Sequence, residues 1–402
     1  MMFSMMPILA SPPCPGKSGR RSRPLPGLLL AALVALSPLS AEAYETKAPY
    51  AYLMDAETGA ILLDKNGDQP MPPASMSKLM TVFLLMEDIQ SGRVGLDSQF
   101  SVSENAWAKG GASSGSSTMF LHPHSQVRVE DLLRGIIVQS GNDACIVVAE
   151  NLAGSEMDFA ARMTARAREL GLKDSHFVNA TGWPDPEQMM SARDLAVLSR
   201  EIVTRFPQFY EVFGEKEFTY NGIKQGNRNP LLYKFPGADG LKTGHTQDSG
   251  YGLTASAKLN GRRLILVLNG LASMKDRSAE SERLLTWGFH EFDNYRLFKK
   301  GDKVETAQVW LGSRPSVDLL APQDYVITLP RAARRDLKVT VVLDEPVPAP
   351  IAAGQKIAVL RIAAPGMETT EKPLLAAGAV DRLGFVGRIG AAARYLFWGY
   401  SK

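Results

Sequence analysis

The stretch PPASMSKLMT (residues 72–81) places Ser75, Ser77 and Lys78 at the start of an otherwise apolar run. The run continues to Met86, which is too long for a typical strand and predicts a helix buried on nearly all sides, with Ser75 near its first turn. Side chains three residues apart lie on one face of a helix, so the Lys78 ammonium can reach the Ser75 hydroxyl. The stretch therefore predicts a serine–lysine pair at the edge of a buried helix.

This pair suits nucleophilic chemistry, because a serine hydroxyl is a weak nucleophile until a base removes its proton. A lysine can be that base only when its pKa falls from about 10.4 toward neutrality, which burial and a second nearby cation both promote. The Ser-x-x-Lys pattern alone is weak evidence, since about one copy is expected by chance in such a chain. It occurs once here, and a helix-capping serine beside a solvated lysine is the alternative.

Two tripeptides further along the chain strengthen the chemical interpretation. Ser140-Gly141-Asn142 falls between two expected helices, and Lys242-Thr243-Gly244 stands just before a hairpin pattern. Each tripeptide is expected about 0.05 times by chance, and their occurrence in this order after Ser-x-x-Lys is rarer still.

The three motifs in this order resemble the signature of the penicillin-binding proteins and serine β-lactamases. The longer stretches SGNDAC (residues 140–145) and DGLKTGHT (residues 239–246) look like the low-molecular-mass D-alanyl-D-alanine carboxypeptidases of the S11 type, over essentially residues 48–402. The resemblance implies a serine-type hydrolase without a cofactor. It would remove the terminal D-alanine from peptidoglycan pentapeptides through an acyl-enzyme and would be inhibited by penicillin.

The resemblance also implies roles for the first two motifs. Ser75 would be the acylated nucleophile and Lys78 its general base. Ser140 would relay a proton toward the leaving D-alanine nitrogen, while Asn142 would hold the peptide amide.

The third motif and one arginine would bind the substrate. Lys242 would supply positive potential beside the substrate carboxylate, and the Thr243 hydroxyl would donate a hydrogen bond to it. Arg228 matches the family arginine that binds this carboxylate, a task that suits a guanidinium fork. Gly244 and His245 complete the set, and the backbone N–H of His245 would form an oxyanion hole with that of the nucleophile.

The pattern of apolar, β-branched and turn-forming residues along the chain predicts its domains. The pattern of residues 44–297 predicts an α/β (α+β) domain in which a helical cluster packs on an antiparallel sheet, and the resemblance implies that this is a peptidase domain of the penicillin-binding type. Its expected strands are residues 50–55, 60–63, 250–257 and 263–268, and its expected helices are residues 75–86, 129–138, 142–152, 156–170, 191–204 and 278–292. Residues 298–375 predict a small all-β domain with strands at 304–311, 325–329, 337–343 and 356–362.

The two ends of the chain predict export and membrane attachment. Residues 1–43 hold a basic segment, an apolar core at 28–36 and the small-x-small site Ala41-Glu42-Ala43, which together indicate a signal peptide. Residues 376–402 carry apolar and aromatic residues at helical spacing together with arginines, and predict an amphipathic membrane-anchor helix. A terminal helix that packs on its own protein is the alternative. These features predict a peripheral protein on the periplasmic side of the cytoplasmic membrane.

Charge and cysteine content limit the partners. The segment 1–43 holds four of the 45 basic and one of the 42 acidic residues, so 41 of each remain and nothing indicates nucleic acid. The expected partners are peptidoglycan stem peptides, β-lactam antibiotics as covalent inhibitors, and the membrane surface. Cys14 lies in the leader, and Cys145 lies in an apolar run that predicts a buried structural thiol.

Four alternatives remain at the level of sequence. Gly111-Ala112-Ser113-Ser114-Gly115 satisfies Gly-x-Ser-x-Gly but lies among small polar residues rather than between a strand and a helix. A DD-endopeptidase would cleave cross-links with the same machinery. A class A β-lactamase would use an additional glutamate for deacylation, and no Glu-x-x-Leu-Asn stretch lies between residues 140 and 242. A catalytically silent binding protein could share the scaffold.

Overall fold

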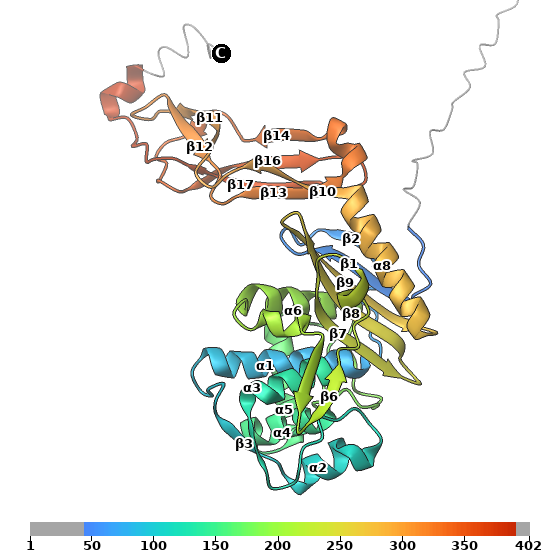
Figure 1. The fold of residues 1–402 in the computed structure, drawn as a ribbon. Helices are drawn as coiled ribbons and strands as arrows, with labels where there is room; N and C mark the ends of the chain where they lie inside the picture. The colour runs from blue at the N-terminus through green and yellow to red at the C-terminus, as the bar shows by residue number, and fades with distance from the viewer. Residues whose placement is uncertain (1–43, 391–402) are drawn as a thin grey trace, which may run out of the picture. The chain divides into compact units, whose positions relative to one another are not determined.

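The computed structural model describes residues 44–390 of the chain. The predicted signal peptide and the last part of the predicted anchor helix lie outside the described residues. The first domain is built on a five-stranded antiparallel sheet with the order β2-β1-β9-β8-β7 (Figure 1). Its strands are β1 (Tyr50–Asp55), β2 (Ile61–Lys65), β7 (Ala238–Thr246), β8 (Gly250–Leu259) and β9 (Arg262–Leu271).

The sheet joins the two ends of this domain, because β1 pairs with β9, with Leu53 opposite Leu266. The tight turn between β8 and β9 is Asn260-Gly261, and both residues have positive φ angles (51° and 84°). Such a turn matches the right-handed twist of the two strands, which explains why Asn-Gly predicts it.

Helices cover both faces of the sheet. Side chains alternate along β9, so that Ile265 and Val267 join the core under the helical cluster, while Leu264 and Leu266 pack with Leu284 of α8. Both faces of β9 are therefore buried. The helices are α1 (Lys78–Gln90), α2 (Glu104–Gly110), α3 (Val129–Arg134), α4 (Asn142–Ala153), α5 (Glu156–Glu169), α6 (Ala192–Arg205), α7 (Leu231–Lys234) and α8 (Met274–Glu291).

Short elements surround the helical cluster. Two-stranded ribbons are formed by β3 (Gln99–Ser101) with β4 (Gln126–Arg128) and by β5 (Glu217–Tyr220) with β6 (Ile223–Gly226). Short 3-10 turns cover Ala74–Ser77, Ala112–Ser114 and Tyr210–Gly214, and a π-helical turn covers Gly135–Gln139. A further 3-10 turn, Arg331–Asp336, lies in the second domain.

The second domain is all-β and has its own core. A six-stranded sheet has the order β14-β16-β17-β12-β11-β15, and β10 pairs with β13. Their bounds are β10 (Phe292–Phe298), β11 (Lys303–Trp310), β12 (Ser316–Leu320), β13 (Tyr325–Pro330), β14 (Lys338–Val342), β15 (Val347–Pro348), β16 (Lys356–Ala363) and β17 (Thr370–Ala376). Leu319, Leu329 and Leu360 lie at the centre of this core.

The predicted fold class is confirmed, and the predicted helices and strands of the two domains are present with their ends within four residues of the expected positions. At the start of the predicted anchor helix, residue 376 ends β17, Val380 is buried in the core of the β domain, and the chain becomes helical only at residue 385. One predicted helix differs in kind, because residues 129–138 divide into α3 and the π-helical turn that leads to Ser140. The small polar segment around Gly111 follows α2 and forms a 3-10 turn, without the strand that a nucleophile elbow requires. Over residues 44–390, no helix is long and apolar enough to cross a bilayer.

Candidate active site

Ser75 lies in the 3-10 turn Ala74–Ser77, and α1 begins at Lys78. The Lys78 Nζ donates a hydrogen bond to the Ser75 Oγ at 2.7 Å and another to the carbonyl oxygen of Thr181 at 2.6 Å. The lysine side chain is only 1% exposed, whereas Ser75 faces a cleft. The amine is thus held from both sides and is directed at the serine oxygen.

Burial is also the main influence on the protonation of this amine. It lowers the pKa of Lys78 from 10.5 to about 8, and the positive charge of Arg228 acts in the same direction. An amine with a pKa near 8 is partly neutral at physiological pH and can accept a proton from the serine hydroxyl.

The strand β7 forms one wall beside the serine. Figure 1 shows β7 at the edge of the sheet, next to the helical cluster. A β-carbon on Gly244 would lie 2.9 Å from the Pro73 carbonyl oxygen and 3.2 Å from the Ala74 Cβ. Only a glycine therefore lets the strand approach the 3-10 turn so closely.

The side chain of Lys242, a residue of β7, is buried, and its Nζ donates to the Thr243 carbonyl oxygen at 3.2 Å. Burial, followed by the positive charges of Lys78 and Arg228, holds the pKa of Lys242 well below its ordinary value of 10.5. Two lysines and an arginine thus share one site, which makes the cleft favourable for an anion.

The tripeptide at residues 140–142 forms a second wall. Ser140 joins the π-helical turn to α4 with a φ of 62°, a left-handed conformation that is rare for residues other than glycine. The Asn142 Nδ2 donates to the Ser116 Oγ at 2.9 Å. The Asn142 Oδ1 is buried, and no described residue donates a hydrogen bond to it. Such an acceptor is suited to bind an N–H group of a ligand.

Asp143, which the sequence did not single out, holds this wall in place. Its fully buried carboxylate accepts hydrogen bonds from the Thr118 Oγ1 at 2.6 Å and from the backbone N–H groups of Met119 at 2.8 Å and Leu121 at 3.1 Å. The segment that carries Ser116 is therefore fixed against α4.

Arg228 extends into the cleft from the loop after β6, where its Nη1 donates to the Ser117 Oγ at 2.6 Å. The asparagines on either side fix this loop. The Asn227 Nδ2 donates to the Glu215 carbonyl oxygen at 3.0 Å, and the Asn229 Nδ2 donates to the Gly240 carbonyl oxygen at 2.7 Å. Because Gly240 belongs to β7, the second hydrogen bond fixes the loop that carries Arg228 against this strand.

The cleft has a volume of about 620 Å³. Seven of the nine predicted site residues line it: Ser75, Ser140, Asn142, Arg228, Thr243, Gly244 and His245. The other two, Lys78 and Lys242, lie behind its surface. The His245 ring stacks on Tyr251 with ring centroids 3.9 Å apart.

Gly182 is another residue of the site that the sequence did not reveal. It has a φ of 80°, and a β-carbon there would lie 2.0 Å from the Ala74 carbonyl oxygen. The Gly182 N–H donates to the Asn179 Oδ1 at 2.7 Å. The loop that contains Gly182 therefore packs directly against the 3-10 turn of Ser75. This contact places the Thr181 carbonyl oxygen where it accepts the hydrogen bond from Lys78.

The sequence pattern of the D-alanyl-D-alanine carboxypeptidase family matches residues 37–272. The chain belongs to this family. The pattern of the penicillin-binding protein 5 C-terminal domain matches residues 292–382, so both domains of this low-molecular-mass penicillin-binding protein have counterparts. The predicted family, enzyme class and D-alanyl-D-alanine carboxypeptidase function are confirmed at this level.

Curated relatives agree with this membership. The chain is 39% identical over 340 residues to the D-alanyl-D-alanine carboxypeptidase DacC of Escherichia coli, covering 84% of this chain and 85% of that protein. It is 43% identical over 323 residues to DacD of the same organism, covering 80% and 83%.

Solved structures share the fold as well. Penicillin-binding protein 5 of Haemophilus influenzae superposes with a TM-score of 0.78 at 37% identity and covers 84% of this chain and 98% of that one. The ampicillin-bound form of penicillin-binding protein D2 of Listeria monocytogenes superposes with a TM-score of 0.53 at 29% identity, covering 61% and 98%.

Proposed function

We propose that this carboxypeptidase removes the terminal D-alanine from uncross-linked peptidoglycan pentapeptides through an acyl-enzyme at Ser75. The observation that carries the proposal is the 2.7 Å hydrogen bond from the buried Lys78 Nζ to the Ser75 Oγ at the edge of a cationic cleft. A nucleophile and its base within hydrogen-bond reach are what acyl transfer requires.

In acylation, the neutral Lys78 amine accepts the Ser75 proton while the Oγ attacks the carbonyl carbon of the penultimate D-alanine. The Oγ–C bond forms, and the backbone N–H groups of Ser75 and His245 stabilise the negative oxygen of the tetrahedral intermediate. The C–N bond then breaks, and the Ser140 hydroxyl gives its proton to the leaving nitrogen while it takes up the proton that Lys78 received from Ser75, so that the lysine amine is neutral again. The terminal D-alanine then leaves the site, and the rest of the peptide remains attached to the Ser75 Oγ as an ester.

Substrate orientation follows from the charges of the cleft. Arg228 and the Thr243 hydroxyl bind the terminal carboxylate, and Lys242 adds positive potential from below. The Asn142 Oδ1 accepts a hydrogen bond from an amide N–H of the peptide, which supplies the partner that this buried oxygen lacks among the described residues. The peptide then lies along β7 with its scissile carbonyl above Ser75.

In deacylation, water attacks the ester and the Ser75 Oγ leaves. No aspartate or glutamate of the described chain lines the cleft, so no carboxylate is placed to activate this water as the additional glutamate of a class A β-lactamase does. A penicillin acyl-enzyme therefore hydrolyses slowly, and β-lactams act as covalent inhibitors. The ampicillin-bound relative of Listeria monocytogenes supports this binding mode.

The test is the release of D-alanine from a soluble pentapeptide by the purified chain, with Ser75→Ala as the control. Release by the wild type alone supports the proposal. A folded wild type that instead cleaves only cross-linked dimers would overturn it in favour of the endopeptidase. Steady-state penicillin hydrolysis would favour the β-lactamase.

We also propose that residues 1–43 direct export and that the helical segment beginning at residue 385 binds the membrane surface, which would place the enzyme on the periplasmic side of the cytoplasmic membrane. Phe385, Val386 and Ile389 support the second assignment, since their side chains are 71%, 83% and 56% exposed. Sedimentation with anionic phosphatidylglycerol vesicles tests it. The full chain should pellet, and a chain ending at Gly384, which keeps the contacts of Val380 and Arg382 with the β domain, should remain in the supernatant.

A further inference from the structure

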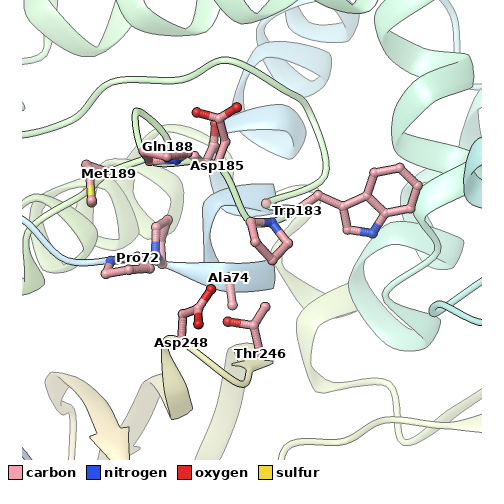
Figure 2. Close-up of a pocket in the computed structure, with 12 residues that line it drawn as sticks. Pro72, Ala74, Trp183, Asp185, Gln188, Met189, Thr246 and Asp248 are labelled. Carbon is pink, nitrogen blue, oxygen red and sulfur yellow. The ribbon is translucent and has the colours of Figure 1, made fainter.

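A second cavity, of about 210 Å³, adjoins the cleft and shares Gly182, Trp183 and Thr246 with it. Its walls are the segment Pro72–Ala74, which immediately precedes the serine, and the loop from Gly182 to Met189 (Figure 2). A molecule attached to the Ser75 Oγ can therefore extend directly into this cavity.

The direction of β7 shows which part of a peptide reaches the cavity. Thr243 lies at the carboxylate-binding end, and His245, two residues on, supplies the oxyanion N–H. Thr246 and Asp248 follow on the far side and line the second cavity. Because an extended peptide advances about 3.3 Å per residue, the residue that precedes the two D-alanines lies at Thr246 and Asp248.

The two cavities carry opposite charges. The charged side chains that line the cleft are Arg228 and Arg277, whereas those that line the second cavity are Asp185 and Asp248. This polarity along one groove matches a peptide with a carboxylate at its end and a cation two residues before it.

Asp248 is the freer of the two carboxylates. The Asp185 Oδ1 accepts a hydrogen bond from the Glu187 N–H at 2.8 Å, within its own loop. Asp248 is exposed, and no described residue donates a hydrogen bond to its carboxylate or forms an ion pair with it. Figure 2 shows Asp248 pointing toward Ala74, beside Thr246.

We propose that this cavity binds the side chain of the diamino acid that precedes D-Ala-D-Ala in the stem peptide. The methylene groups pack against Trp183 and Met189, and the free ammonium group lies beside the Asp248 carboxylate. The inference rests on the proposed function, since it concerns the same peptide. It follows that acylation of this amine, as in a cross-link, lowers the rate by removing the positive charge.

The experiment compares two peptides that differ only in this charge, Nα-acetyl-L-Lys-D-Ala-D-Ala and Nα,Nε-diacetyl-L-Lys-D-Ala-D-Ala. For the wild type, kcat/KM should be about two- to fivefold higher for the free amine, as expected for one solvent-accessible ion pair. Asp248→Asn should remove this preference by lowering kcat/KM for the free-amine peptide to about the value for the capped peptide. Asp344→Asn, an exposed aspartate of the β domain, is the matched control and should keep the preference.

The outcomes separate the subsite from the proposed function. Equal kcat/KM values for the two peptides in the wild type, or an equal loss on both peptides in Asp248→Asn, would overturn the subsite. Release of D-alanine from the capped peptide would meanwhile uphold the proposed function. Release from neither peptide by a folded wild type would overturn both.

Discussion

The depressed pKa of Lys78 makes the pH dependence of acylation a quantitative prediction. The neutral amine is the base, so the reactive fraction rises with pH. The fall in pKa from 10.5 to about 8 raises the neutral fraction at pH 7 from about 0.03% to about 10%, roughly 300-fold. Acylation should therefore increase about tenfold between pH 6 and pH 7 and level off above about pH 9.

The assay is the second-order rate constant of labelling by a fluorescent penicillin between pH 5.5 and pH 10, with circular dichroism to confirm folding at each pH. Lys78→Arg is the matched control, because a guanidinium stays protonated over this range, and its labelling should be slow throughout. A wild-type rate that is flat from pH 6 to pH 8 would refute the role of Lys78. A rate that still rises tenfold per pH unit near pH 10 would refute the effect of burial.

Three further predictions follow from the geometry of the cleft. Arg228→Gln should lower kcat/KM for a carboxylate-terminated peptide about 10- to 100-fold, the value of a charge-assisted hydrogen bond, and should affect the C-terminal amide of the same peptide much less. Gly182→Ala should slow penicillin labelling at least tenfold and lower Tm, because its β-carbon would collide with the Ala74 carbonyl oxygen; unchanged labelling would mean that the loop does not position the serine turn. Asp143→Ala should lower the free energy of unfolding in urea by about 3 kcal/mol, since it leaves several buried donors unpaired. A loss under 1 kcal/mol would show that Asp143 does not hold the segment around Thr118 against α4.

The sequence was sufficient to predict the serine–lysine pair, because its geometry is local. A spacing of three residues at the start of a helix brings the two side chains together whatever the rest of the chain does. The alternation along β9 and the Asn260-Gly261 turn are local in the same sense. These features let the fold class be predicted without any knowledge of distant contacts.

The rest of the site depends on contacts between distant segments. The sequence does not predict β7 as a strand, because ADGLKTGHT contains two glycines and few apolar residues. Its polar side chains line the cleft instead of the core. Gly182 stands in a loop where a glycine is ordinary, and its role emerges only beside Ala74. Asp143 likewise lies within a predicted helix, and the loop that it braces is more than twenty residues away.

The central claim is that Ser75 carries the acyl group, and mass spectrometry of the penicillin-labelled protein tests it most directly. One penicilloyl group per chain is expected, located on the peptide that contains Ser75, and none is expected on Ser75→Ala. A penicilloyl group on Ser140 or Ser113, or undiminished labelling of Ser75→Ala, would contradict it.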